Sequence, residues 1–506
     1  MIVLGYTVGI DLGTTNTVCC GFDNELYSVK FGREHMLPSI LAYRNGKISI
    51  GRSAKNALTG YSGNVITSSK RFMGENKVWY IDDREFNPTI VASEILKEVK
   101  YAAEQYFKKK VEREGGQFDE DEKIEIVITV PARFDLKQVE ETKKAALLAG
   151  FEIKRVLTEP VAAAIAYGLD NNVYKNIFVI DIGGGTFDIC LMDFQTAEKV
   201  KTIHIDGDNK LGGDDFDEVI VEMCYAHIRK NYGINLSDEK KSGLESFRYT
   251  DAVDAIRRAA ERAKIALSDS ESASIEIPNL FVKNGKIINL EYTITRSEFE
   301  NEAMLLFNKI RRKIERFMKD IEKGTDFIDK VLLVGGTLNI PYIQNYLKDY
   351  FGADKVCCEN DLSKLVAEGA AMMAAQDGTL LKIQVEDVLS YDLGIAAKSH
   401  SGENIFSVII PKSTKYPVAI TKKYSTAKDN QETIPIDVYE GDSRRIEDNH
   451  KYGRVTLSDF PKGPAGLPVM VEFSIDEDKI LNVKVVEQKS GKYKTEKIML
   501  GYEAAK

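Results

Sequence analysis

Two segments of the chain each place an aspartate at the end of an apolar run, directly before a turn of glycine and threonine. Residues 8–17 read VGIDLGTTNT around Asp11, and residues 179–188 read VIDIGGGTFD around Asp181. The backbone N–H groups and threonine hydroxyls of such a turn can bind phosphate oxygens, because glycine lets the backbone come close. The aspartate can hold a hydrated divalent cation. A facing pair would therefore clamp a polyphosphate with Mg²⁺, whereas one copy alone is equally well an ordinary tight turn.

A third segment, residues 331–337, is an apolar strand that ends in Gly335 and Gly336, where a flat ring could approach the backbone. By itself this segment is more often an ordinary strand-to-helix turn, and residues 259–268 are more often a plain surface helix. The sequence contains no GxxxxGK(S/T), GxGxxG or GxSxG motif. The duplicated turn is therefore the strongest chemical signal.

Two kinds of element must position these residues. Up to about Ile383, apolar strand-like runs alternate with amphipathic helical patterns, as in α/β proteins. Asp135 can cap the helix that follows it. Beyond Gln384 the chain changes to short alternating strands separated by turn clusters, which is typical of an all-β domain. The repeated turn predicts two α/β lobes with a cleft between them.

Composition excludes several classes of function. The 506 residues, with 43% hydrophobic side chains and a net charge of −9, fit a globular protein without the basic surface of a nucleic-acid-binding protein. No apolar stretch reaches the ~18 residues of a membrane span, and the N-terminus lacks a secretory signal pattern. The 6 cysteines lack zinc-site spacing, and the 5 histidines are scattered. We expect a cytoplasmic protein that binds neither nucleic acid nor membrane.

Further motifs give the sequence a specific resemblance. They are residues 69–72 (SKRF), 127–131 (VITVP), 157–164 (LTEPVAAA), 211–217 (LGGDDFD), 335–336 (GG) and 424–431 (YSTAKDNQ). With the two phosphate turns, these motifs resemble the heat shock protein 70 family, the DnaK-type chaperones. The resemblance implies an α/β fold with an actin-like two-lobe ATPase domain of duplicated ribonuclease-H-like units (1–383), a linker (384–388) and an all-β sandwich for peptide binding (389–506). It implies an ATP-dependent molecular chaperone that hydrolyses ATP to ADP and phosphate.

Carried over by position, the resemblance also implies site residues. Asp11 and Asp181 would orient hydrated Mg²⁺, with K⁺ as a second candidate ion. Lys70 would reach the γ-phosphate and the attacking water, while Glu159 and Asp188 would orient that water or accept its proton. Thr186 completes the catalytic set. The ATP-binding residues would be Asp11, Gly13, Thr14, Thr15, Asn16, Gly183, Gly184, Gly185, Gly212, Gly213, Glu261, Lys264, Ser268, Gly335, Gly336 and Thr337.

The β-domain would bind extended hydrophobic peptides by backbone hydrogen bonds and an apolar pocket. The alternative interpretation is that the pocket residues only form the domain's own core, and for Leu393 and Tyr424 it is an equally good one. The partners would be unfolded peptides, a J-domain co-chaperone and a nucleotide exchange factor. The residues that couple the domains would be Pro131, Arg155 and Asp387, and the pocket residues would be Leu393, Ile395, Tyr424, Ala427, Ile434 and Ile436.

Three features depart from the family pattern. Gln384 and Glu386 put polar side chains into a linker that is mostly leucine in the family, which predicts weaker linker docking. Arg133 stands where the family has an aromatic residue. The sequence ends at Lys506, where the family's helical lid would begin. The resemblance thus predicts a lidless or C-terminally truncated member with fast peptide exchange.

Other functions remain open at the level of sequence. A small-molecule kinase or an actin-like filament protein could use the same turns, but neither accounts for a β-domain after Asp387. A degenerate relative could bind ATP and one dedicated partner with little turnover.

Overall fold

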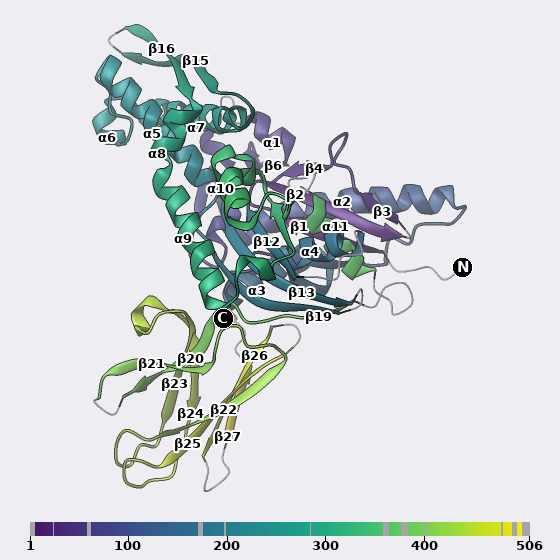
Figure 1. Cartoon of the computed structure of the whole chain (residues 1–506), viewed down its shortest axis with the longest axis vertical. Helices are drawn as coiled ribbons and strands as arrows, with labels where there is room; N and C mark the ends of the chain where they lie inside the picture. Colours follow the sequence, from purple (N-terminus) through teal and green to yellow (C-terminus); the bar gives the residue numbers. More distant parts are fainter. Residues whose placement is uncertain are drawn as a thin grey trace.

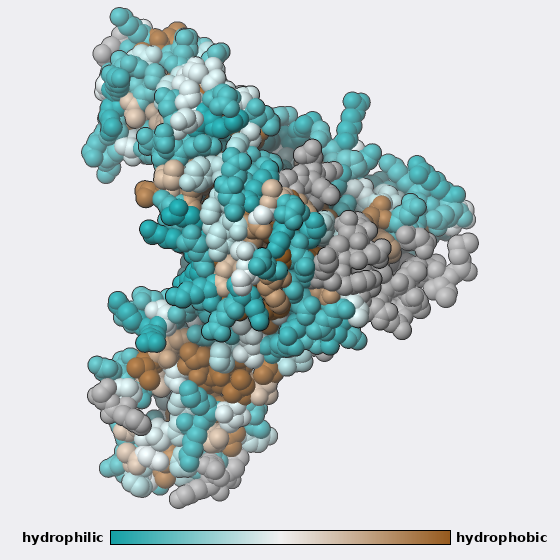
Figure 2. Space-filling model, in the orientation of Figure 1, coloured by the Kyte–Doolittle hydropathy of each residue, from teal (hydrophilic) through white to brown (hydrophobic). Residues whose placement is uncertain are grey.

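The computed structural model describes residues 6–23, 25–57, 62–170, 176–196, 199–283, 285–357, 364–375, 383–399, 402–476, 479–487 and 493–497. A large α/β body of two lobes lies next to a smaller β body (Figure 1). Figure 2 shows a mainly hydrophilic surface on the larger body and hydrophobic surface gathered on the β body near their junction. Within the described ranges, no helix combines the length and apolar composition of a bilayer span.

The first lobe is built on a six-stranded sheet with the order β11-β10-β1-β2-β3, in which β4 pairs with β2. Strand β1 is parallel to β10 and antiparallel to β2, so the turn after Asp11 lies at the carboxyl end of the parallel pair. Asp135 caps α3 through the amide of Gln138, as the sequence predicts. The elements are β1 (Thr7–Leu12), β2 (Asn16–Asp23), β3 (Glu25–Ser28), β4 (Met36–Pro38), β10 (Glu125–Val130), β11 (Glu152–Thr158), α2 (Pro88–Arg113) and α3 (Leu136–Leu148).

The second lobe repeats this arrangement. Its six-stranded sheet has the order β18-β17-β12-β13-β14-β19, with β12 parallel to β17 and antiparallel to β13. Asp181 in β12 therefore occupies the place of Asp11 in β1. The elements are β12 (Asn176–Ile182), β13 (Phe187–Thr196), β14 (Lys199–Asp208), β17 (Lys330–Val334), β18 (Val356–Cys357), β19 (Gln384–Glu386), α9 (Met304–Asp320) and α10 (Pro341–Phe351).

Helices α4 (Glu159–Asp170) and α11 (Leu365–Ala374) join the two lobes through a shared alanine-rich core. Gly369 permits their close approach, since a Cβ there would lie 1.8 Å from the Ala162 carbonyl oxygen. Each lobe also carries an outer part. The first has α1 (Arg52–Ala57), β5 (Leu41–Arg44), β6 (Lys47–Ile50), β7 (Val65–Ile66), β8 (Trp79–Ile81) and β9 (Arg84–Phe86), and the second has α5 (Gly213–Tyr232), α6 (Glu239–Ser242), α7 (Ser246–Asp269), β15 (Ser272–Lys283), β16 (Lys286–Thr295) and α8 (Arg296–Glu302).

The β body consists of two four-stranded sheets, β21-β20-β23-β24 and β22-β25-β26-β27. Alternate residues of these strands point inward and form one core. The strands are β20 (Asp392–Lys398), β21 (Asn404–Ile410), β22 (Val418–Ser425), β23 (Ile434–Gly441), β24 (His450–Leu457), β25 (Pro468–Ile475), β26 (Leu481–Glu487) and β27 (Tyr493–Lys497).

The segment between the two bodies is itself a strand. In β19, Gln384, Val385 and Glu386 pair in parallel with β14 and extend the second sheet. Ile383 and Val388 on either side are buried in the core shared by the lobes. The two polar side chains stay at the surface, so the expected weakening of linker docking does not prevent docking here. Backbone hydrogen bonds, which do not depend on side-chain type, hold this segment together with the buried side chains of Ile383 and Val388.

Candidate active site

The two glycine-threonine turns face each other across the cleft, as the duplicated sequence predicts. A Cβ on Gly184 would lie 2.2 Å from the Thr15 hydroxyl oxygen, and a Cβ on Gly185 would lie 3.2 Å from the Thr14 methyl group. A larger residue at 184 would therefore require the Thr15 side chain to move. Thr15 and its neighbour Asn16 are exposed to the cleft side, whereas Thr14 is nearly buried.

Lys70 lies at the base of the cleft among four carboxylates. It sits in the short helix η2 (Ser69–Phe72), is 5% exposed, and its Nζ is 2.5 Å from Glu159 Oε1. Burial raises the pKa of Asp11 to about 7 and that of Asp188 to about 8, and the negative charge of Glu159 adds to both shifts. Burial also raises the pKa of Asp181, with the charges of Glu159, Asp188 and Asp11 adding to the shift. The positive charge of Lys70 opposes all three shifts.

This group of carboxylates has the chemistry of a site for a hydrated divalent cation. The charge of Glu159 adds to the raised pKa of Asp11, Asp181 and Asp188, and Asp188 Oδ2 is buried without a hydrogen-bond partner. Mg²⁺ favours carboxylate oxygens and keeps most of its waters, so Asp11 and Asp181 fit the ion that the sequence predicts. In the part of the chain that the structure describes, no three His, Cys, Asp or Glu side chains are grouped to ligate a metal directly.

A third wall closes the site on the second lobe. Thr337 Oγ1 donates to the Gly183 carbonyl at 2.8 Å. Gly335 has a φ of 93°, and a Cβ added there would lie 2.4 Å from the Ile182 carbonyl oxygen. Lys264 Nζ donates to the Gly213 carbonyl at 2.9 Å. The Gly335 turn, the Gly212–Gly213 turn and helix α7 therefore meet beside the turn of Gly183 to Gly185, and all three carry residues that the resemblance implies for ATP binding. Gly336 follows in the same turn, η4 (Gly336–Asn339).

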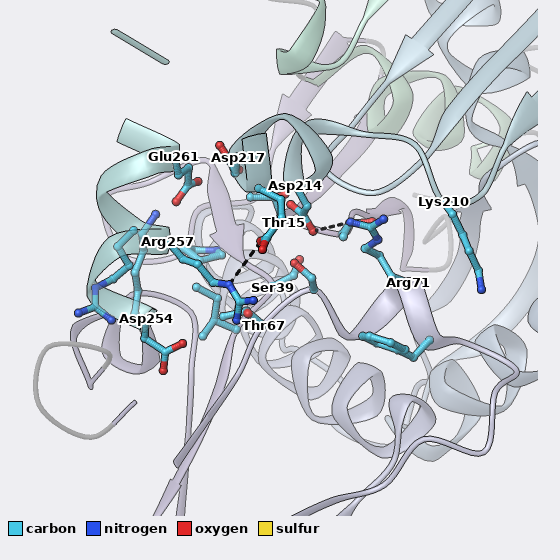
Figure 3. A pocket seen from close by; sticks show the side chains of 18 of the residues that line it. Thr15, Ser39, Thr67, Arg71, Lys210, Asp214, Asp217, Asp254, Arg257 and Glu261 are labelled. Atoms are coloured by element: carbon cyan, nitrogen blue, oxygen red, sulfur yellow. Dashed lines mark hydrogen bonds and ion pairs between the residues drawn. The ribbon is translucent and has the colours of Figure 1, made fainter. Parts of the chain in front are cut away.

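A cavity of about 510 Å³ opens between the lobes beside these turns (Figure 3). Thr14, Thr15 and Glu261 line it, but Ser268, two turns further along α7, does not. Figure 3 shows Asp254, Arg257 and Glu261 on one side of the cavity and Arg71 and Lys210 on the other.

Sequence reasoning assigned no role to Arg71, which spans the cleft. Its guanidinium lies 3.1 Å from Asp215 and 3.5 Å from Asp214, at the start of α5 in the opposite lobe. Arg71 lies inside the SKRF motif and both aspartates lie inside LGGDDFD. The opposite charges of Arg71 and the two aspartates were the only signal in the sequence. Pairing these residues requires knowing that the two motifs face each other in the fold.

Comparison with known proteins decides the family. A family profile described as Hsp70 protein matches residues 7–79 and 76–506. Chaperone protein DnaK of Thermosipho melanesiensis is 34% identical over 500 residues, which cover 97% of this chain and 79% of the relative. The DnaK proteins of Thermosipho africanus (34%, covering 96% and 79%) and Halobacterium salinarum (33%, covering 96% and 73%) are also similar. The chain belongs to the Hsp70 family.

Membership of the Hsp70 family confirms the predicted fold class, with actin-like ATPase lobes followed by a β-sandwich. This Hsp70 chain is an ATP-dependent molecular chaperone and an ATPase. Proteins of the family bind ATP or ADP with Mg²⁺. The kinase, filament and degenerate-relative alternatives are not favoured by these relatives.

The residues predicted to contact peptide fall into two groups in this Hsp70 structure. Tyr424 is half-buried, with its hydroxyl 2.9 Å from the Ser407 hydroxyl, and Ala427 is exposed. The other four are at most 6% exposed and belong to the core of the β-sandwich: Leu393, Ile395, Ile434 and Ile436. In this conformation they stabilise the sandwich, which is the alternative interpretation that the sequence left open.

The predicted coupling residues of this Hsp70 chain lie close to the junction. Asp387 is 4% exposed and accepts a hydrogen bond from the Tyr416 hydroxyl at 2.7 Å. Burial raises the pKa of Tyr416, the charge of Asp387 adds to the shift and the charge of Arg155 opposes it. Pro131 is buried and begins the turn between β10 and α3.

Proposed function

We propose that this Hsp70 chain binds ATP across the cleft and that Lys70, Glu159, Asp188 and Thr186 carry its hydrolysis. The observation that supports this most strongly is the Lys70–Glu159 contact of 2.5 Å inside a group of buried carboxylates, directly below the two phosphate turns. Phosphoryl transfer passes through a loose anionic transition state, so positioning and electrostatics supply most of the catalysis. A buried ammonium group suits that task, since its charge acts at low dielectric.

The other site residues would divide into three tasks. The turn residues Gly13, Thr14, Thr15, Asn16, Gly183, Gly184 and Gly185 would hold the phosphates, and Gly212, Gly213, Glu261, Lys264, Ser268, Gly335, Gly336 and Thr337 would hold adenosine. Asp11 and Asp181 would hold Mg²⁺ through its waters, and K⁺ is a second candidate. The bound cation would supply neutralisation of phosphate charge. Asp188, with one free buried oxygen, would orient the attacking water or accept its proton.

We further propose the domain division 1–383, 384–388 and 389–506. The β19 strand, flanked by buried Ile383 and Val388, supports a linker at this place. The β-sandwich would bind extended hydrophobic peptides near Tyr424 and Ala427. A J-domain co-chaperone and a nucleotide exchange factor would be its partners in the cytoplasm.

Single-turnover ATP hydrolysis with and without an unfolded model peptide tests this proposal. We expect the peptide to change the hydrolysis rate, because two contacts join the β-domain to the nucleotide-binding lobes. Strand β19 pairs with β14, and Arg133 donates to the Ser390 carbonyl. Absence of hydrolysis in both conditions would contradict the catalytic assignment. Hydrolysis that is indifferent to peptide would contradict coupling alone.

The junction also predicts a pH dependence of docking. Glu440, 6% exposed, accepts a hydrogen bond from the Leu136 amide at 3.1 Å across the junction. Burial raises its pKa well above the ordinary 4.5, and the charge of Asp135 adds to the shift, while Lys479 and Arg133 oppose it. The docked state therefore favours the protonated carboxyl, and docking should weaken as pH rises above 4.5 toward the raised pKa.

Small-angle scattering of the whole chain across that pH range measures domain separation. We expect Glu440→Gln to remove the dependence, because an amide keeps an acceptor oxygen without the titrating charge. A wild-type separation that stays constant with pH would contradict this prediction.

A further inference from the structure

Arg133 belongs to the nucleotide-binding lobes, but its side chain is held by the β-domain. It lies in the turn between β10 and α3 and is 7% exposed. Its Nη1 donates to the Ser390 carbonyl at 2.9 Å, and its Nη2 donates to Asp442 Oδ2 at 2.6 Å. The guanidinium carbon lies 3.9 Å from the centre of the Tyr391 ring. The guanidinium is also 3.7 Å from Asp206 Oδ1, which lies in β14 of the second lobe. Three of these four interactions therefore cross the junction.

The backbone of the same residue holds the proposed catalytic carboxylate. The Arg133 amide donates to Asp188 Oδ1 at 3.1 Å. The Tyr391 hydroxyl donates to the Arg133 carbonyl at 2.8 Å, and the Ser390 hydroxyl donates to the Ala132 carbonyl. The β-domain thus contacts the peptide group that contains this amide, through the Ala132 carbonyl, and the next peptide group, through the Arg133 carbonyl. Arg133 therefore contacts Asp442 through its side chain and Asp188 through its backbone amide.

Separation of the two domains would remove most of the side-chain contacts of Arg133. The guanidinium would lose Ser390, Asp442 and Tyr391 and keep Asp206. The Ala132 carbonyl would lose the Ser390 hydroxyl, and the Arg133 carbonyl would lose the Tyr391 hydroxyl and keep Asn209 Nδ2, which donates to it at 2.6 Å. The Arg133 side chain is buried and Asp442 is partly exposed while the domains are docked, and a charge-assisted hydrogen bond between them is short and directional. The position of the Arg133 amide therefore depends on docking.

We propose that Arg133 is a positioning residue through which the docked β-domain fixes Asp188, with the Arg133–Asp442 ion pair as the contact that carries the signal. This inference rests on the proposed role of Asp188 in ATP hydrolysis. It differs from coupling through the linker, because Asp442 lies far from β19 in the sequence and reaches the cleft by a separate path. It also gives a function to the arginine that replaces the family's aromatic residue.

The test uses the full chain and single-turnover ATP hydrolysis with and without an unfolded model peptide. Arg133→Gln and Asp442→Asn should each bring the ratio of the two rates close to one. The double variant should be no further changed than either single variant, because both substitutions remove the same pair. Asp442→Glu should keep the ratio, since it preserves the charge.

Arg454→Gln is the control, because it breaks an arginine–aspartate pair of the same length (2.6 Å, with Asp437) that is more exposed and lies entirely within the β-domain. Its rate ratio should equal that of the wild type. Amide hydrogen exchange gives a second readout: the Arg133 amide should exchange faster in Asp442→Asn and at the wild-type rate in Arg454→Gln.

A wild-type rate ratio and unchanged exchange in Asp442→Asn would overturn the inference. A wild-type chain without ATP hydrolysis would instead overturn the proposed catalytic function, and the exchange experiment would still decide whether Asp442 holds the Arg133 backbone. Additive effects in the double variant would show two independent contacts and would also overturn the pair as the signal.

Discussion

Replacement of Lys70 by alanine should abolish ATP turnover while ATP binding stays largely intact. The Lys70 ammonium lies 2.5 Å from Glu159, and its charge opposes the raised pKa values of three further carboxylates. Removing one preorganised group that stabilises charge in a transition state typically lowers the rate about 10²–10³-fold. The phosphate turns, the Gly335 turn and α7 do not depend on this side chain, so we expect nucleotide affinity to change much less than the rate.

The measurement is single-turnover hydrolysis beside equilibrium ATP binding. Lys77→Ala is the matched control: Lys77 is an exposed lysine a few residues later in the chain, near the rings of Phe72 and Trp79. Its rate should stay close to that of the wild type. Because Lys70→Ala leaves Glu159 buried without its partner, thermal unfolding should confirm that the variant is folded at the assay temperature. An unchanged turnover rate in folded Lys70→Ala would remove the catalytic role of this lysine.

Substitution of Gly212 by alanine should sharply weaken ATP binding. A Cβ at this position would lie 2.6 Å from the carbonyl group of Gly184 and from the amide nitrogen of Gly185. Both contacts are with backbone, so the phosphate turn itself has to move. A shift near 1 Å in groups that position a substrate can cost about 10²-fold. We therefore expect a large loss of affinity without loss of the overall fold.

Gly324→Ala provides the control for this substitution. Gly324 has φ −77° and no atom within 4 Å of its added Cβ, so alanine fits there without strain. Equilibrium titration with ATP should give wild-type affinity for Gly324→Ala and a much weaker affinity for Gly212→Ala. Equal affinities in the two variants would show that the Gly212 turn does not support the phosphate site.

The site could be predicted from sequence where one short motif carries both the residue type and the turn. Asp11 and Asp181 each lie near the end of a strand in a repeated motif, and the two strands occupy equivalent places in the two sheets. Two similar sequences fold to two similar lobes, so their turns face each other. The contact between Arg71 and Asp215 joins motifs that are 144 residues apart and carry no common pattern, so only the fold brings it to light.

The β-domain shows a second limit. Leu393 and Ile395 share one face of β20, as Ile434 and Ile436 share one face of β23, and this period of two is typical of a core strand and of a strand that lines a peptide site. The structure shows that these side chains are buried in the sandwich core, which the sequence pattern alone does not determine. The linker shows a related limit: Gln384 and Glu386 predict weaker docking through side-chain burial, whereas the pairing of β19 with β14 uses the backbone. The Arg133 contacts were also beyond reach, since they depend on how the domains sit together.

The place of β19 has a consequence for the sheet that receives it. Paired with β14, it covers the outermost strand, whose N–H and C=O groups would otherwise be open to another chain. When the linker leaves, that edge is uncovered. Lys199 and Lys201 lie along it, and Lys199 is 3.3 Å from Glu386 while the linker is in place. Once released, these lysines would present like charges to any second copy of the same strand and so oppose self-association.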